Sequence, residues 1–172
     1  MSGTPGMDHC AECGFDYRLD EADRAAASIR AGAAELAAAL GDCPDASDRR
    51  APELWSPLEY GCHVRDVLLV QRERVLLARR SDTPALMTMG RDERAAHDGY
   101  ADQDPAEVAA ELVMAARLLA TVLDRLGDDW NRSVLYNYPD RTERDLRWVA
   151  VHTVHEVRHH LLDIRRQIGA IR

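Results

Sequence analysis

Four of the seven histidines of this chain fall within one short stretch, at positions 152, 155, 159 and 160. On an α-helix, with ~3.6 residues per turn, His155 and His159 lie one turn apart and project from the same face. Two imidazoles in this arrangement can bind the same metal ion. His152 precedes His155 by about one turn on nearly the same face, whereas His160 is rotated away from His159 by about 100°.

Apolar residues recur at helical spacing around these histidines, which predicts one core-facing helix over residues 142–168. The histidines would then point inward or lie at the edge of the core. A buried histidine can equally be a structural residue that forms hydrogen bonds within the core. The paired i, i+4 spacing raises the metal-binding interpretation to the level of this structural one.

His63 can supply a third ligand from a different helix. It shares a helical stripe with Val67 and Val70 and is therefore expected to face inward. In a bundle, where helices pack side by side, His63 could meet His155 and His159. Three imidazoles leave positions open on a divalent ion, which is typical of a catalytic metal site. The sequence therefore predicts metal binding by these three histidines, and the donor set accepts zinc, nickel, cobalt or iron.

Start and stop signals delimit four helices and predict an all-α four-helix bundle. Ser56 provides the N-cap of the second helix, and Asp104 provides that of the third, directly before Pro105. The alanine-rich first helix ends at Gly41. Residues 130–144 are expected to form a loop that leads into the histidine helix, and no strand is predicted. The predicted helices cover residues 19–40, 56–80, 105–126 and 142–168.

Two long connections join these helices. Residues 42–54 are rich in proline and charge, and they form a loop long enough to cross one end of the bundle. Residues 81–104, between the second and third helices, break the helical periodicity. This longer connection can be a lid over a site, a crossover with a short helix around residues 92–97, or both. His97 is expected at the surface or in such a lid.

The N-terminal cysteines are a second candidate site. Cys10 and Cys13 form a C-x-x-C followed by Gly14, which resembles one knuckle of a zinc ribbon. A complete structural zinc site needs four ligands, and the sequence has no second C-x-x-C. Cys43, His9 or a second subunit would have to complete the site. The alternative is an arm with free thiols, because a cytoplasmic protein seldom has disulfides.

The composition indicates one acidic domain. The chain has 172 residues and a formal net charge of −8, so it lacks the basic surface that binds nucleic-acid phosphates. No apolar run reaches the ~18 residues of a membrane span, and the N-terminus does not resemble a signal peptide. We therefore expect a cytoplasmic protein without nucleic-acid or membrane partners. It divides into an N-terminal arm, residues 1–18, and a helical domain, residues 19–172.

Two separated motifs resemble those of a known family. Residues 55–66, WSPLEYGCHVRD, resemble the first metal-ligand motif of the DinB-like (DinB/YfiT) superfamily, and residues 155–161, HEVRHHL, resemble its closing H-x-x-x-H motif. The resemblance covers roughly residues 19–168. It implies a four-helix bundle of the DinB/YfiT type with unusual connectivity, often as a homodimer. It also implies that three histidines hold a divalent metal, most often zinc or nickel.

The resemblance further implies an enzyme that acts on a small-molecule substrate. Characterised relatives include bacterial transferases and isomerases that use the thiols mycothiol or bacillithiol. A thiol cofactor at the metal would become a thiolate and attack an electrophilic substrate. A metal-dependent hydrolase could use the same ligands. A non-enzymatic metal-binding or assembly protein is the other alternative, and a fourth ligand such as His152 or Cys62 would favour it.

Charged residues near the histidines in sequence are candidates for supporting roles. Glu59, Asp66 and Glu156 lie within about one turn of a histidine and could orient a ligand. Arg158 could bind the carboxylates of a thiol cofactor. Solvated helix surfaces explain all four residues equally well.

Overall fold

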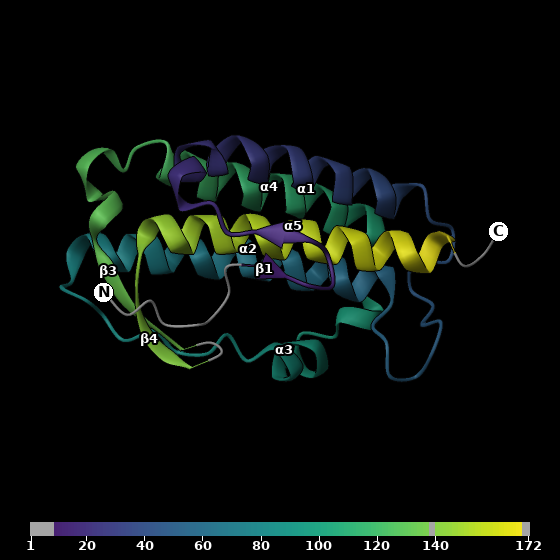
Figure 1. Cartoon of the computed structure of the whole chain (residues 1–172). Helices are drawn as coiled ribbons and strands as arrows, with labels where there is room; N and C mark the ends of the chain where they lie inside the picture. Colours follow the sequence, from purple (N-terminus) through teal and green to yellow (C-terminus); the bar gives the residue numbers. More distant parts are fainter. Residues whose placement is uncertain (1–8, 138–139, 170–172) are drawn as a thin grey trace.

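The computed structural model describes residues 9–137 and 140–169, which form a four-helix bundle with an added short helix and two β-hairpins. α1 and α2 each pack against both α4 and α5, so α1 and α2 lie on one diagonal of the bundle (Figure 1). The predicted all-α bundle is confirmed. Within the described residues, no helix is long and apolar enough to span a membrane. The bundle helices are α1 (Ala25–Gly41), α2 (Pro57–Arg80), α4 (Pro105–Leu123) and α5 (Leu146–Gly169).

The predicted starts of α2 and α4 are confirmed by their hydrogen bonds. The Ser56 hydroxyl accepts from the amide of Glu59, and the Glu59 carboxylate accepts from the amide of Ser56, which completes the capping box. Asp104 caps α4 by accepting from the amides of Ala106 and Glu107. These caps satisfy amides that have no partner inside the helix.

The remaining helix ends differ from the prediction by a few residues. A 3₁₀-helix, η1 (Leu19–Arg24), occupies the predicted first turns, and α1 begins only after it. No side chain caps α1 at its start, so the tighter turns of η1 lead into it instead. The short helix predicted in the long connection is confirmed as α3 (Arg91–His97), followed by the 3₁₀-helix η2 (Tyr100–Asp102).

The absence of strands was predicted wrongly. Instead of a loop, the chain before α5 forms a hairpin of β3 (Ser133–Asn137) and β4 (Arg141–Asp145), and α5 therefore begins at Leu146 and not at residue 142. In β3 the side chains alternate, with Val134 and Tyr136 buried. β4 has the sequence RTERD and no apolar residue, so it shows no pattern of its own. Backbone pairing with β3, a tertiary contact, makes it a strand.

The N-terminal cysteines lie on a second, smaller hairpin. β1 (His9–Cys10) pairs antiparallel with β2 (Phe15–Asp16). Gly14 closes the turn with a φ of 69°, and its amide donates to the carbonyl of Cys10. The ring of Phe15 is buried and lies 5.4 Å from the ring of His155, which places the hairpin on α5. A further 3₁₀-helix, η3 (Gly127–Asn131), follows α4.

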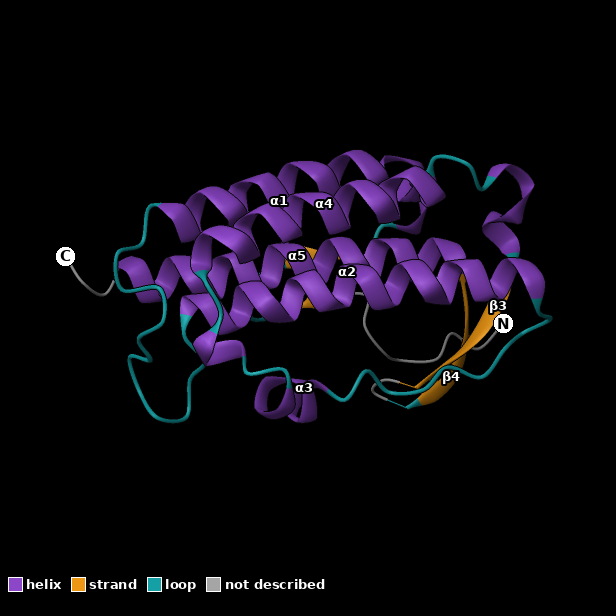
Figure 2. Cartoon of the chain, turned by 180° about the vertical axis from the view of Figure 1, so that it is seen from behind, coloured by secondary structure: helices purple, strands orange, loops and turns teal. Residues whose placement is uncertain are grey.

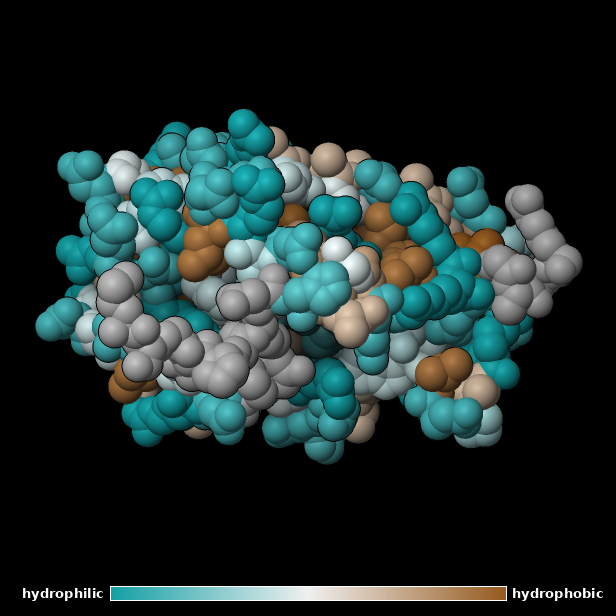
Figure 3. All heavy atoms as spheres, viewed as in Figure 1, coloured by the Kyte–Doolittle hydropathy of each residue, from teal (hydrophilic) through white to brown (hydrophobic). Residues whose placement is uncertain are grey.

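α3 and the β3–β4 hairpin lie on one side of the bundle (Figure 1). Figures 1 and 2, from opposite directions, both show α3 and the β3–β4 hairpin beside the layer of α2 and α5, away from α1 and α4. Figure 3 shows that hydrophilic residues cover most of the face seen in Figure 1, with apolar spots scattered among them. The long connection and both hairpins can therefore enclose a site against α2 and α5.

The close approach of α1 and α5 depends on a glycine. A Cβ atom added at Gly32 of α1 would lie 2.5 Å from Cγ1 of Val157 in α5. Val157 is buried and β-branched, so its side chain has little freedom to move aside. Gly32 thus sets the distance of α5, which carries the histidines, from α1.

Gly32→Ala is therefore expected to lower the free energy of unfolding by about 1–2 kcal/mol, because overpacking costs more than the helix gains from alanine. Denaturant unfolding followed by circular dichroism measures this change. Gly41→Ala is the matched control on the same helix, since a Cβ there would have no neighbour within 4 Å. Equal stability of the two variants would contradict the tight α1–α5 contact.

Candidate metal centres beside a cavity

A cavity of about 810 Å³ lies between α2, α5, the long connection and both hairpins. α2 contributes His63, Val67, Val70 and Arg74, so the predicted inward stripe of this helix forms one wall. The connection between α2 and α4 contributes residues 88–91 and therefore covers part of the cavity. α5 contributes the side chains with metal-binding capacity: His152, His155, Glu156, His159 and His160.

The α5 side chains form two stripes with different partners. His152, Glu156 and His160 follow one another at intervals of four residues, and His155 and His159 form a second stripe beside them. The first stripe faces α2, whereas the second faces the β1–β2 hairpin. The rotation of α5 in the bundle decides which stripe meets which partner.

The first candidate centre consists of His63, Glu156 and His160. The Nε2 atoms of His63 and His160 lie 4.0 and 3.8 Å from Oε2 of Glu156. Tetrahedral ligands at about 2.1 Å from a metal are separated by about 3.4 Å, so a small inward movement would suffice to bind one ion. The rings of His63 and His160 are 4.9 Å apart and edge to face. The three groups converge on the cavity wall.

The second candidate centre consists of Cys10, Cys13, His155 and His159. One ligand atom from each residue lies within 4.8 Å of the others. Sγ of Cys10 is 3.7 Å from Nδ1 of His159. Nε2 of His155 is buried and has no hydrogen-bond partner. An orphaned nitrogen of this kind, next to two sulfur atoms, fits a metal ligand.

Glu156 lies between the two centres. Its Oε1 is 3.3 Å from Nδ1 of His155, while its Oε2 faces His63 and His160. Burial raises the pKa of this carboxyl, but the nearby imidazoles, first those of His155 and His160, hold the pKa well below its usual value. Glu156 is therefore an anion in the middle of the histidines.

The histidines differ strongly in basicity. Burial, together with the neighbouring His160, lowers the pKa of His63 to about 4. Burial likewise lowers the pKa of His152 to about 4. For His160 burial also acts to lower the pKa, but Asp163 and Glu156 outweigh it and raise the pKa to about 9. Neutral His63 is ready to donate a lone pair to a metal, whereas His160 has to release a proton first.

The thiols of Cys10 and Cys62 also differ strongly in pKa. Burial acts to raise the pKa of Cys10, but the amide of Cys13 and the side chain of His155 lower it to about 6. Burial raises the pKa of Cys62 to about 12. Cys62 contacts the carbonyl of Tyr100 and the amide oxygen of Gln103, so it does not serve as the fourth ligand considered from the sequence.

The three predicted ligands are divided between the two centres. Among the described residues, His155 and His159 group with the two cysteines, and His63 groups with His160 and Glu156. Two smaller sets also exist among these residues, in which His155 lies near His152 and Glu156, and His159 lies near His160 and Asp163. Joint binding of one ion by His63, His155 and His159 stays a prediction.

Of the predicted supporting residues, Glu156 alone reaches the histidines. Glu59 is occupied by its capping box and by Arg49, which donates to both carboxylate oxygens. Arg158 lies over the ring of Phe15 at 5.4 Å, away from the cavity wall. His97 ends the exposed helix α3, as expected for a surface position.

Sequence reasoning overlooked His160 and the pairing of the two motifs. His160 was set aside because it points away from His159, yet that rotation brings it to His63. C-x-x-C and H-x-x-x-H together are a familiar zinc-ligand set, so the sequence did contain a signal for grouping the two motifs. The paired residues Cys10 and His159 are 149 positions apart, however, and only the fold brings them together.

Asp66 of α2 anchors the long connection over the cavity. Its carboxylate accepts from the hydroxyl of Tyr100 at 2.7 Å and from Arg94 at 3.3 Å, both in the connection. Arg65 donates to the other oxygen at 2.9 Å. Asp66 is buried, so these partners replace its hydration.

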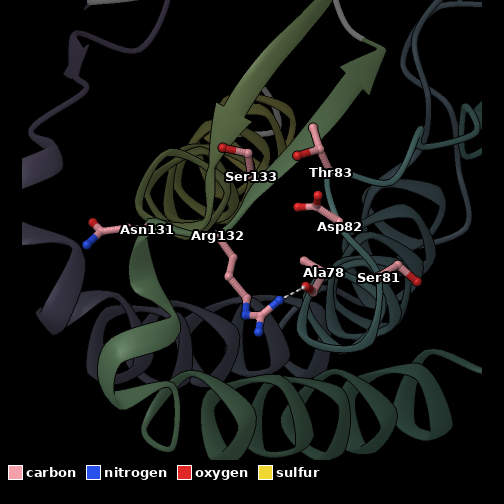
Figure 4. Close-up of a pocket in the computed structure, with 7 residues that line it drawn as sticks. All are labelled: Ala78, Ser81, Asp82, Thr83, Asn131, Arg132 and Ser133. Atoms are coloured by element: carbon pink, nitrogen blue, oxygen red, sulfur yellow. Dashed lines mark hydrogen bonds between the residues drawn. The ribbon is translucent and has the colours of Figure 1, made fainter.

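A smaller cavity of about 260 Å³ lies at the far end of α2 (Figure 4). Arg132 crosses it and donates to the carbonyl of Ala78. Asp82 is the only acidic side chain among its described lining residues, which include no histidine or cysteine. This cavity therefore offers no comparable set of metal ligands.

Comparisons with known proteins agree with the four-helix bundle fold. Residues 16–164 match the sequence profile of the DinB superfamily. The fold is similar to the solved structure of YfiT from Bacillus subtilis, with a TM-score of 0.75 over 98% of this chain and 94% of that chain at 15% identity. YfiT is described as a probable metal-dependent hydrolase with an unusual four-helix bundle topology. No curated protein matches this chain in sequence.

Asp66→Asn is expected to lower the free energy of unfolding by about 2–4 kcal/mol, because it leaves Arg65 and Arg94 without their buried anion. Denaturant unfolding measures the stability, and limited proteolysis after arginine reports the release of α3. The control is Asp92→Asn, which removes an exposed partner of Arg91 and should change stability by less than about 0.5 kcal/mol. Unchanged proteolysis in Asp66→Asn would show that Asp66 does not anchor the connection.

Proposed function

The chain belongs to the DinB superfamily, and on that premise we propose that it is a metal-dependent enzyme with a small-molecule substrate. The observation that carries the proposal is the convergence of His63, His160 and Glu156 on the wall of the 810 Å³ cavity. Three protein ligands leave part of the coordination sphere of an ion open to the cavity. A volume of this size is typical of sites that bind small organic molecules.

The residues present fit a divalent ion. Two imidazole nitrogens and a carboxylate oxygen form a common donor set for zinc and other divalent metals. The facing nitrogens, Nε2 of His63 and Nε2 of His160, belong to side chains of the cavity wall and lie 4.0 and 3.8 Å from the same oxygen, Oε2 of Glu156. A divalent ion bound by His63, Glu156 and His160 would act as a Lewis acid that lowers the pKa of a thiol or of water, so that a nucleophile exists at neutral pH.

The cavity wall can bind an anionic molecule. Arg74 is held by neutral groups, since it donates to the hydroxyl of Tyr136 at 2.9 Å and to the carbonyl of Met87 at 2.6 Å. Its charge therefore stays available to a ligand. Arg91 lines the same cavity from the connection and lies over the ring of Trp55. Two arginines on opposite elements suit a substrate or cofactor with carboxylates.

We favour thiol chemistry as the reaction of this site. A thiol cofactor such as mycothiol or bacillithiol carries polar groups for Arg74 and Arg91, and the cavity has room for the thiol and an electrophile together. The sulfur would attack the electrophilic carbon, which gives an S-conjugate or starts a thiol-assisted isomerisation. Val67, Val70 and Met89 supply apolar surface for the electrophile.

Hydrolysis is the second candidate, and two observations support it. The set of two histidines and one carboxylate is the one that hydrolytic zinc enzymes use. The similar structure, YfiT, is described as a probable metal-dependent hydrolase. The two candidates share the metal ligands and differ in the nucleophile.

One experiment separates the candidates. Protein loaded with zinc or nickel is supplied with a chlorodinitrobenzene electrophile, with and without mycothiol or bacillithiol, and in parallel with nitrophenyl esters. Conjugation that depends on an added thiol supports the transferase, and ester cleavage without thiol supports the hydrolase. Absence of both, despite a bound metal, would favour the non-enzymatic alternative for this fold.

His160→Ala is expected to lower activity by about a hundredfold or more, because it deletes a metal ligand. It should also remove metal from the centre formed by His63, Glu156 and His160, which we call the open centre. Elemental mass spectrometry and initial rates measure the two effects. His97→Ala on the exposed helix α3 is the matched control and should behave as wild type. His159→Ala should keep the open-centre metal. The reverse result, with His159 essential and His160 dispensable, would favour the ligand set predicted from the sequence.

A further inference from the structure

The C-x-x-C of the N-terminal hairpin takes no part in the proposed reaction, yet it lies directly against α5. We propose that Cys10, Cys13, His155 and His159 bind a zinc ion as a closed, tetrahedral Cys₂His₂ site that is separate from the open centre. The four ligand atoms lie within 4.8 Å of one another. This second site is structural, and it fastens the β1–β2 hairpin to the bundle.

The separation of the ligand atoms matches coordination of one ion. Zn–S bonds of about 2.3 Å and Zn–N bonds of about 2.05 Å at a tetrahedral angle place sulfur and nitrogen about 3.6 Å apart. Sγ of Cys10 is 3.7 Å from Nδ1 of His159. His155 offers one ligand atom within 4.8 Å of these two, and both of its ring nitrogens are buried without a hydrogen-bond partner. A zinc ion would give Nε2 of His155 a partner.

The hairpin has the backbone of a zinc knuckle. Gly14 has a φ of 69° and closes the turn, with its amide donating to the carbonyl of Cys10. The amides of Glu12 and Cys13 face the sulfur of Cys10, and the amide of Phe15 faces that of Cys13. Amides directed at sulfur stabilise thiolates, the form in which cysteine binds zinc.

A carboxylate lies at ion-pair distance from one nitrogen of each imidazole, which leaves the other nitrogen for the metal. Nε2 of His159 is 3.3 Å from Oε2 of Glu12 and 3.6 Å from Oδ2 of Asp163, so its Nδ1 is left for the metal. Nδ1 of His155 is 3.3 Å from Oε1 of Glu156, an ion-pair distance without a hydrogen bond, which leaves Nε2 for the metal. Metal-binding histidines commonly have a carboxylate beside their other nitrogen.

The donor set explains why the site would be closed and structural. Two thiolates balance the charge of Zn²⁺, and four protein ligands leave no position for a substrate. The hairpin also carries Phe15, packed on His155, and leads to Tyr17, whose hydroxyl is 3.0 Å from Nδ1 of His152 at the cavity. Zinc would thus hold one wall of the cavity in place.

Cobalt substitution tests the proposal without any assay of activity. Wild-type protein, reduced and stripped of metal, is titrated with Co²⁺ and monitored by absorption spectroscopy. We expect intense tetrahedral d–d bands and a thiolate-to-cobalt charge-transfer band. The charge-transfer band should be lost in Cys10→Ser/Cys13→Ser and in His155→Ala/His159→Ala. Cys43→Ala, which changes a buried cysteine outside the hairpin, should keep it.

Metal counting and thiol protection complete the test. Zinc-loaded wild type should hold two ions per chain, and the Cys10→Ser/Cys13→Ser variant one. His63→Ala/His160→Ala should also hold one ion but keep the charge-transfer band, so failure of the open centre is distinguishable from failure of this site. Zinc should protect Cys10 and Cys13 of the wild type from alkylation. Absence of the band in wild type, its persistence without the two histidines, or unprotected thiols would each overturn the proposal.

Discussion

The anion of Glu156 is the constraint on which the site depends. A carboxylate that is four-fifths buried needs positive or hydrogen-bonding partners, and in this chain the imidazoles around it supply them. One of its oxygens faces His155 and the other faces His63 and His160. The residue therefore links the histidines of α5 to His63 of α2 at the cavity wall. It also brings the two candidate centres next to each other, since Glu156 of the first centre directly follows His155 of the second in α5.

The rotation of α5 gives this carboxylate its position. The interval of four residues between Glu156 and His160 turns both toward α2, and the neighbouring stripe of His155 and His159 then has to face the N-terminal hairpin. The contact of Gly32 with Val157 on the opposite side of α5 leaves little room for any other rotation or distance. Packing on one face of the helix thus determines the chemistry on the other.

Much of the fold could be predicted because its signals are local. The capping box at Ser56, the N-cap at Asp104 and the helical periodicity each depend on residues within a few positions of one another. The β3–β4 hairpin could not be predicted in this manner. The sequence RTERD of β4 has no strand pattern, and its conformation depends on a partner strand and on the burial of Val134 and Tyr136.

The sequence by itself determined the inventory of the site: which histidines share a helical stripe, that His63 faces inward, and that Gly14 follows the C-x-x-C where a turn can form. These are properties of a single helix or turn, where geometry follows directly from spacing. Only the tertiary structure decided which groups meet. The pairing of His63 with His160, and of Cys10 with His159 at 149 positions' distance, depends on how far α5 is rotated and where the arm lies. Those quantities follow from the packing of the whole core, because no local spacing encodes them.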